Sequence, residues 1–288
     1  MAVVATGFFD GVHIGHRLVI ETLVRSARER GEESLIITLW PHPRLVLHRD
    51  ALGLRLLNTL DEKIKLLRSL GVDRVEVLPF TQEFAETSTA DYLGACVRDR
   101  FGGTAVLLGY DNRIGHDSLT PEQTAALAAE CGLDVIRTDK VSSVGLAVSS
   151  TKIRQALLAG DVATASTYLC YDYMLEGEVV HGRKLGRTIG YPTANMEVYE
   201  QMKLVPSQGV YLTRVRLADR SFFGMTNVGG VIETHILDFD EEIYGHGMKL
   251  EFLQRVRGEM NFPDGLASLR KQLLEDEQTC RGILEKFK

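Results

Sequence analysis

Hydrophobic residues follow two different rhythms along the chain, and the change between them falls near residue 168. Before that point, short apolar runs of strand length alternate with segments whose apolar residues recur at helical spacing. This alternation predicts a parallel sheet with crossover helices. The expected strands cover residues 2–5, 34–39, 74–78, 104–108 and 134–137, and the expected helices cover 17–30, 60–70, 89–100 and 121–130.

After residue 168, extended apolar runs predominate and helical patterns are few. Such runs predict an antiparallel barrel or sandwich. Helical spacing returns only at the end of the chain, and short helices are expected where the two halves join. The expected strands are 173–180, 210–217, 221–225, 235–239 and 248–256, and the expected helices are 151–159, 162–169, 265–275 and 276–287.

Length and composition fit two folded domains. The 288 residues exceed the usual size of one domain, and 44% hydrophobic residues supply enough apolar surface for two cores. The predicted architecture is therefore a doubly wound parallel-sheet α/β domain in residues 1–168, followed by an antiparallel β-barrel domain with terminal helices in residues 169–288.

Charge and cysteine content exclude several classes of protein. A formal net charge of −6 argues against a general nucleic-acid binder, which usually carries a basic surface. The four cysteines form no Cys-x-x-Cys pair, so reduced thiols of a cytosolic protein are expected. Because neither a secretory leader nor a bilayer-length apolar run is recognised, we expect a cytoplasmic protein without nucleic-acid or membrane partners.

The segment from Gly7 to His16, GFFDGVHIGH, places two histidines around a glycine between an expected strand and an expected helix. The amides and dipole of a helix N-terminus attract anions, and Gly15 lets a phosphate approach the backbone closely. His13 and His16 are therefore candidates for a nucleoside triphosphate site. The alternative is an ordinary surface turn in which the glycines only permit positive φ.

A second group of polar residues lies at the start of the helix expected at 151–159. Ser150 and Thr151 offer hydroxyls there, and Lys152 and Arg154 offer two positive charges. Such a cluster can hold a polyphosphate. The alternative is an ordinary helix N-cap followed by exposed basic residues.

A third group is the loop at 181–195, HGRKLGRTIGYPTAN, which contains three glycines and three cations. Amide donors and basic side chains can together bind phosphate in such a loop. The order of residues is not that of a Walker loop. The alternative is a flexible hairpin with solvated charges.

Together these three segments resemble those of one enzyme family. The first resembles the signature of the nucleotidylyltransferase superfamily, and most closely that of the prokaryotic bifunctional riboflavin kinase/FAD synthetases. The SSTKIR run at 149–154 resembles that family's Ser-Ser-Thr-x-Ile-Arg segment, and the loop at 181–195 resembles its riboflavin kinase signature. The resemblance implies a nucleotidylyltransferase domain followed by a riboflavin kinase domain. It also implies two reactions with ATP and Mg²⁺, riboflavin to FMN and then FMN to FAD.

For FAD formation, the resemblance implies that the phosphate of FMN attacks the α-phosphorus of ATP. The nucleophile is already anionic, so catalysis reduces to positioning and charge neutralisation, with Lys152 as a further candidate donor. Asp10 is expected to shape its loop rather than to act as a base. The implied residues are the catalytic His13, His16 and Arg154 and the ATP-binding Gly7, Phe9, Gly15, Ser150 and Thr151.

Two further segments resemble the family less closely. The WPHP run at 40–43 is similar to an aromatic residue followed by Pro-His-Pro, although a rigid loop explains it equally well. The run at 108–115 resembles a segment in which Asp111 and Arg113 would bind flavin. Ile114 stands there for an aromatic residue, and acidic Asp117 stands where basic residues are usual.

For FMN formation, the resemblance assigns Mg²⁺ and ATP phosphates to Thr193 and Asn195, whose neutral oxygens suit a hard cation. Gly182 and Gly190 would contact ATP in the same loop. Glu233 matches the general base that takes the proton of the riboflavin 5′-hydroxyl. The alternative for a lone glutamate at a strand edge is a solvated side chain.

The kinase half departs from the family in one connection. Only residues 230–232 separate Asn227-Val228-Gly229 from Glu233, where the family has a longer polar loop. A first alternative is therefore an FMN adenylyltransferase whose kinase half binds flavin but is impaired. A second is a catalytically silent flavin-binding protein. The sequence leaves the oligomeric state open.

Overall fold

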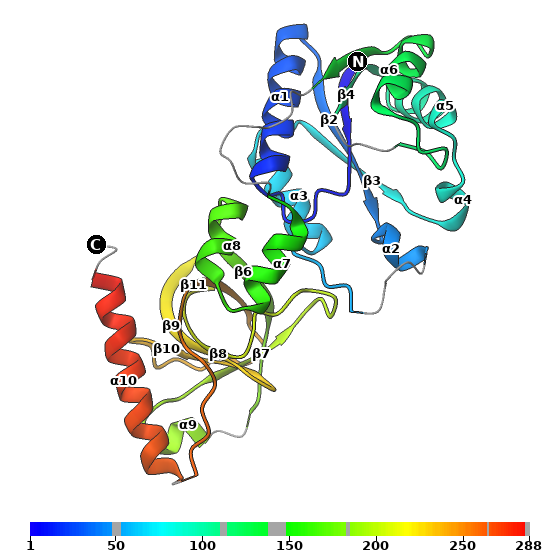
Figure 1. The fold of residues 1–288 in the computed structure, drawn as a ribbon. Coiled ribbons are helices and arrows are strands. Elements are labelled where there is room, and N and C mark those ends of the chain that lie inside the picture. The colour runs from blue at the N-terminus through cyan, green and yellow to red at the C-terminus, as the bar shows by residue number, and fades with distance from the viewer. Residues whose placement is uncertain (48–52, 110–113, 138–147, 183–184, 264, 286–288) are drawn as a thin grey trace. The chain divides into compact units, whose positions relative to one another are not determined.

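The computed structural model describes residues 1–47, 53–109, 114–137, 148–182, 185–263 and 265–285. The chain divides into two compact units, Met1–Ser149 and Ser150–Lys288 (Figure 1). The first unit is built on a parallel sheet and the second on a closed antiparallel barrel. Both predicted architectures are therefore confirmed.

The sheet of the first unit has five strands in the order β3-β2-β1-β4-β5, all parallel. The chain adds strands first on one side of β1 and then on the other. The neighbours β1 and β4 therefore form a topological switch point, and ligands of such sheets bind beyond the carboxyl ends of the strands there. The strands are β1 (Ala2–Thr6), β2 (Glu33–Trp40), β3 (Arg74–Pro79), β4 (Gly103–Leu108) and β5 (Asp134–Arg137).

Hydrophobic clusters cover both faces of this sheet. Val4 of β1 belongs to the cluster that contains Leu93, and the adjacent Val3 belongs to the opposite cluster with Ile20. A strand buried on both faces reads as an uninterrupted apolar run, which is why the sequence located it. Two capping boxes begin helices where the sequence expects them, at Thr59 and Thr120.

The helices of the first unit follow the predicted pattern with two corrections. The helix expected at 17–30 begins earlier, because the His13 side chain caps it. The helix expected at 89–100 is α-helical only in its first turn and then widens to π-helical geometry. The helices are α1 (Ile14–Arg30), α2 (Pro43–Val46), α3 (Leu60–Ser69), α4 (Gln82–Ala85), α5 (Thr89–Asp91), η1 (Tyr92–Arg100) and α6 (Pro121–Glu130).

The barrel of the second unit closes in the order β10-β7-β6-β11-β8-β9. None of the described helices, here or in the first unit, combines the length and apolar character needed to cross a membrane. The elements are α7 (Ser150–Leu158), α8 (Val162–Leu169), β6 (Tyr173–Val180), α9 (Leu185–Thr188), β7 (Ala194–Val198), β8 (Gly209–Leu217), β9 (Arg220–Val228), β10 (Ile232–Ile236), β11 (Gly247–Arg257) and α10 (Leu266–Glu285).

Four elements of the barrel unit differ from the sequence prediction, and one of them is the short helix α9, which was not expected. Strand β7 was not expected, and β10 lies three residues before the strand expected at 235–239. The two helices expected at 265–275 and 276–287 are one helix, α10. Its interior Asp276 is 2% exposed and accepts bidentate hydrogen bonds from Arg257 at 2.8–3.0 Å, so this acidic residue lies at a buried contact.

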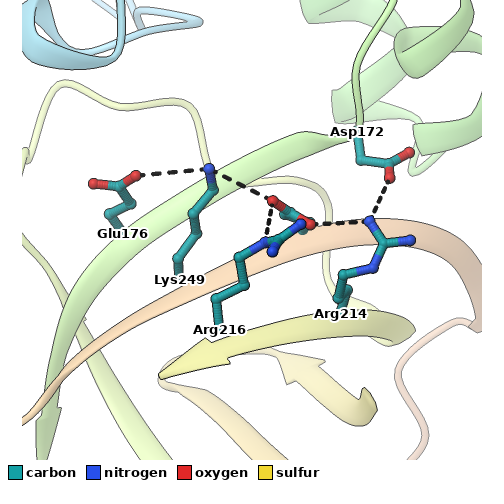
Figure 2. Close-up of polar contacts among 6 residues, drawn as sticks. Asp172, Glu176, Arg214, Arg216 and Lys249 are labelled. Carbon is teal, nitrogen blue, oxygen red and sulfur yellow. Dashed lines mark hydrogen bonds and ion pairs between the residues drawn. The ribbon is translucent and has the colours of Figure 1, made fainter. Parts of the chain in front are cut away.

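A network of six charged side chains covers one side of the barrel (Figure 2). The Glu251 carboxylate lies at its centre, 3.1 Å from Arg214, 2.9 Å from Arg216 and 3.5 Å from Lys249. Asp172 and Glu176 pair with the outer cations of the network. Burial opposes ionisation of Glu251, but the arginine hydrogen bonds outweigh it and hold the pKa of this carboxyl below its usual value.

Replacing the central carboxylate is expected to destabilise the barrel. We expect Glu251→Gln to lower the free energy of unfolding by about 2 kcal/mol, because three neighbouring cations lose their shared counter-charge. Urea unfolding measures the change, and Glu178→Gln, on an exposed position of β6, is the matched control. Equal stability of the two variants would contradict a structural role for the network.

Candidate active sites

The first candidate site is the loop between β1 and α1, at the carboxyl edge of the sheet beside the switch point. Three of its residues have positive φ: Phe9 at 54°, Gly11 at 85° and Val12 at 39°. Left-handed conformations of residues other than glycine are strained and concentrate at functional sites. The loop thereby turns sharply from the strand into the helix and brings His13 to the helix N-terminus.

The two histidines lie against each other at the start of α1. Their rings stack with centroids 3.7 Å apart, and Nδ1 of His13 accepts a hydrogen bond from the backbone N–H of His16 at 3.4 Å. The Phe9 ring contacts His16 edge-on at 5.3 Å. A Cβ at Gly15 would lie 3.3 Å from the His13 ring, and one at Gly7 would lie 3.0 Å from the Phe9 ring. Both glycines therefore have a packing role in this stack.

Burial keeps both imidazoles neutral. It lowers the pKa of His13 from 6.5 to about 4. Burial, and then the charges of His13 and Lys63, lower the pKa of His16 well below its usual value. Because Nδ1 of His13 is an acceptor, its proton is on Nε2. Within the described part of the chain, the buried Nδ1 of His16 has no hydrogen-bond partner. The site can therefore offer imidazole and helix N-terminal N–H groups to an anion.

The neutral state of His13 makes stability depend on pH. Between the unfolded value of 6.5 and the folded value of about 4, the unfolded chain binds a proton that the folded chain excludes. Lowering the pH through this window is therefore expected to cost about 3 kcal/mol of unfolding free energy. His13→Asn keeps a capping oxygen and removes this part of the dependence. Urea unfolding followed by the fluorescence of Trp40, the single tryptophan, measures it. Identical pH dependences in the two proteins would contradict the assignment.

Surrounding residues hold the loop in place. The Asp10 carboxylate accepts hydrogen bonds from the backbone N–H groups of Leu57 and Asn58 at 3.0 and 3.3 Å, which fits the loop-shaping role expected for it. The Phe8 ring stacks on Trp40 with centroids 6.5 Å apart and contacts His42 at 4.2 Å. The WPHP run therefore packs directly against the loop.

The segment after β4 is described only in part. Asp111 and Arg113, expected to bind flavin, lie outside the described residues. The backbone N–H of Thr89 donates to the Asp117 carboxylate at 3.2 and 3.3 Å. A Cβ at Gly115 would lie 2.4 Å from the same nitrogen. The acidic residue that departs from the family pattern thus anchors the start of a helix.

Residues 150–154 of the SSTKIR run are on α7, in the second unit, and Ser149 is the last residue of the first unit. Thr151 and Lys152 are exposed there, Ser150 and Arg154 are partly buried, and Ile153 fixes the helix through its buried side chain. The predicted constellation for FAD formation is thus divided between two units. That its two parts act together stays a prediction.

The second candidate site lies on the barrel wall, where β10 runs between β7 and β9. Glu233 is the register partner of Asn195 on one side and of Asn227 on the other. Residues directly opposite in antiparallel strands point to the same face, with Cβ atoms roughly 5 Å apart. The expected base and an expected metal ligand are therefore neighbours. Thr193 lies just before β7, two residues from Asn195.

The glycine-rich loop at 181–195 packs closely against Asn195 and Tyr191. A Cβ at Gly182 would lie 2.1 Å from Nδ2 of Asn195, and a Cβ at Gly186 would lie 2.1 Å from the carbonyl oxygen of Tyr191. Gly190 has a φ of 87°. Each glycine is thus required by a close approach or by its backbone conformation. These contacts show that the described part of the loop packs against Asn195 and Tyr191.

Two cavities adjoin beside this loop. One, of about 400 Å³, is lined by Thr193 together with Arg187 and Tyr244. The other, of about 750 Å³, lies between the barrel and α10. Both are lined by Pro192, Ile236 and Phe239, so they share a wall. Neither cavity is lined by Glu233 or Asn195.

Oxygen donors are available for a cation at the second site. The described residues contain no group of three or more His, Cys, Asp or Glu side chains placed to bind a metal. The hydroxyl of Thr193, the amide of Asn195 and the carboxylate of Glu233 are hard donors suited to Mg²⁺, with a phosphate as the remaining ligand. The residues present therefore fit this ion.

The connection before Glu233 is a tight hairpin. Val228 of β9 pairs with Ile232 of β10, and Gly229 N donates to Val231 O at 3.2 Å across the turn. The turn itself comprises residues 229–231. Glu233 lies inside β10 rather than at a strand edge.

Sequence reasoning missed two residues at these sites. Asn227 follows only from the register, which the misplaced β10 concealed. Lys63 is 1% exposed beneath the first loop, although a lysine on an amphipathic helix usually points to solvent. The capping box that precedes Lys63 predicts the helix but gives no sign of this burial.

Comparisons with known proteins give one result for both halves. The family model described as FAD synthetase matches residues 1–152, and that described as riboflavin kinase matches residues 169–284. A bifunctional riboflavin kinase/FMN adenylyltransferase of Listeria monocytogenes is 35% identical, covering 99% of this chain and 93% of that one. The Escherichia coli protein of the same name is 32% identical, covering 97% and 91%. A crystal structure from Streptococcus pneumoniae, titled macrolide-efflux protein, has a TM-score of 0.88 at 29% identity, covering 97% and 94%.

Proposed function

The chain belongs to the family of bifunctional riboflavin kinase/FMN adenylyltransferases, and we propose how its residues divide the two reactions. It is a transferase that converts ATP and riboflavin to FMN and ADP, and ATP and FMN to FAD and diphosphate. We assign FAD formation to residues 1–168 and FMN formation to residues 169–288. The family models support this division, since one ends at 152 and the other begins at 169.

In FAD formation, a phosphate oxygen of FMN attacks the α-phosphorus of ATP, and diphosphate leaves. No general base is needed, because the attacking oxygen is already anionic. His13 and His16 donate N–H groups to the phosphates from the helix N-terminus. The remaining proposed contacts are Gly7, Phe9, Gly15, Ser150, Thr151 and Arg154 to ATP and Asp111 and Arg113 to the flavin.

In FMN formation, the 5′-hydroxyl oxygen of riboflavin attacks the γ-phosphorus of ATP, and ADP leaves. Glu233 takes the proton of that hydroxyl as the bond forms. Thr193 and Asn195 hold Mg²⁺, which lowers the negative charge on the phosphate oxygens when bound. Gly182 and Gly190 let the loop backbone contact ATP.

One observation carries the kinase assignment: Glu233 is placed in register beside Asn195. Chromatographic analysis of products from riboflavin with ATP, and separately from FMN with ATP, tests the proposal. The wild-type protein should make FMN and then FAD in the first reaction and FAD in the second. If the protein makes FAD from supplied FMN but no FMN from riboflavin, the kinase half is impaired. The tight hairpin at 229–231 is the departure from the family that raises this alternative. Flavin binding without turnover of ATP would contradict both assignments.

The proposed setting is the cytoplasm, with small molecules as the only partners. This setting is proposed from the sequence, in which the four cysteines form no Cys-x-x-Cys pair. ATP and flavins are the ligands that the two reactions require. Binding to neither nucleic acid nor membranes stays a prediction from charge and composition.

A further inference from the structure

Lys63 is a buried cation beneath the first site, and neither reaction as assigned above uses it. It lies in the first turn of α3, and its side chain is 1% exposed. Removing an ammonium from water is costly unless hydrogen bonds and nearby charge compensate it. Its partners therefore indicate what the charge does at this position.

The ammonium is held by the loop and by β2. Nζ donates to the carbonyl oxygen of Phe8 and to the hydroxyl of Thr38, each at 3.0 Å. The Thr38 hydroxyl donates in turn to the same Phe8 carbonyl at 3.3 Å. Nζ also lies 4.0 Å from the centroid of the Phe8 ring. A carbonyl that accepts two hydrogen bonds has a fixed direction.

Fixing this carbonyl fixes the backbone that follows. The peptide between Phe8 and Phe9 is planar, so the N–H of Phe9 points away from the carbonyl that Lys63 holds. Phe9 then takes its left-handed conformation, and its ring contacts His16 edge-on at 5.3 Å. Lys63 is thus connected to the reacting end of the site through one rigid peptide and one aromatic ring.

The charge of Lys63 also affects the protonation of His16 at the site. Burial lowers the pKa of Lys63 to about 8, although nearby Asp10 opposes this, and the Lys63 charge contributes to keeping His16 neutral. The titratable groups around it are Asp10 from the loop, His13 and His16 from α1, and His42, whose ring lies against Phe8. Carboxylates and imidazoles ordinarily titrate below pH 7, so Lys63 is the group of this set that changes charge near pH 8.

We propose that Lys63 is a positioning residue for adenylyl transfer, whose ammonium fixes the Phe8–Phe9 peptide and places a positive charge beneath the loop that receives ATP. This inference rests on the function proposed for the first site. Lys63 touches no substrate and acts through Phe8 and Phe9. Its protonated form is the active one.

The test measures kcat and KM for ATP in FAD formation from FMN, between about pH 6.5 and 9.5, a range that spans the pKa of Lys63 near 8. The wild-type rate should fall as the pH rises above 8. Lys63→Met should lower kcat by roughly ten- to a hundredfold at pH 7 and remove the alkaline decline. Lys63→Arg stays protonated throughout, so its profile should also be flat above pH 8.

FMN formation by the barrel of the same molecules reports whether each variant is intact, and Lys65→Met, at an exposed position of α3, is the matched control. Lys63→Met with wild-type FAD formation, or with a reduced rate that still declines above pH 8, would overturn the proposal. Where methionine prevents folding, an alkaline decline retained by Lys63→Arg would overturn it equally. If the wild type itself makes no FAD from FMN, the proposed function fails instead.

Discussion

His16→Ala is expected to abolish FAD formation from FMN and ATP while leaving FMN formation intact. The substitution removes the ring that stacks on His13 and receives the edge of Phe9. It also removes an N–H donor from a buried site. Loss of one such donor to a developing negative charge lowers rates by about 10²–10³-fold. Loss of the stack adds misplacement of His13, so we expect FAD to fall below detection.

Chromatography of flavins after separate incubation with FMN and with riboflavin measures both activities of this variant. His116→Ala is the matched control, because His116 belongs to the same unit and is exposed. Riboflavin should still be converted to FMN by His16→Ala, and FMN should accumulate. Loss of both reactions, or retention of FAD formation, would contradict the assignment of His16.

Glu233→Gln is expected to stop FMN formation from riboflavin without affecting FAD formation from supplied FMN. Glutamine keeps the size of the side chain and its place between Asn195 and Asn227, but it cannot take a proton. Removing a general base typically lowers a rate by about 10²–10⁴-fold. Because the geometry is retained, the loss should appear in kcat rather than in KM for riboflavin.

The control for this variant is Glu197→Gln, an exposed carboxylate two residues beyond Asn195 on β7. It should retain both activities. A kinase rate for Glu233→Gln within a few fold of wild type would show that another group accepts the proton. Loss of FAD formation from supplied FMN would show that the two reactions are not separately located.

The sequence predicted the first unit well because its three central strands, β1, β2 and β4, are buried on both faces. Five apolar runs, separated by four helical patterns, correspond to β1–β5, and β5 has the predicted bounds. The position of the first loop also followed, since a glycine-rich segment between strand and helix must lie at the carboxyl edge of the sheet. Local pattern and tertiary burial agree in these segments.

The barrel was harder to predict because the alignment of Asn195, Glu233 and Asn227 depends on the register between strands that lie apart in the sequence. The ANMEV run of β7 is short and mixes polar with apolar residues, so it carries little strand signal. The start of β10 was misplaced by three residues, which concealed the pairing of Glu233 with Asn195 and Asn227. A family signature supplied Glu233 and Asn195, whereas Asn227 needed the structure.

Buried charge was likewise invisible in the sequence. Lys63 occupies an ordinary helical position in the sequence, and its burial comes from Phe8 and Thr38, which lie far away along the chain. The same holds for Asp276, which was expected to begin a second helix but pairs with Arg257 inside a continuous one. Helical propensity depends on the residue itself, so it does not predict burial or ion pairs that involve residues distant along the chain.

The three-residue turn between β9 and β10 affects when the entropy cost of ordering the residues around Glu233 arises. A long polar loop beside a base samples many conformations, and ordering it on substrate binding weakens affinity. Here the strands that carry Asn227 and Glu233 are joined by a connection too short to sample much, and its closure is entropically cheap. The ordering of this carboxylate is therefore completed when the barrel folds, and it is not repeated at each turnover.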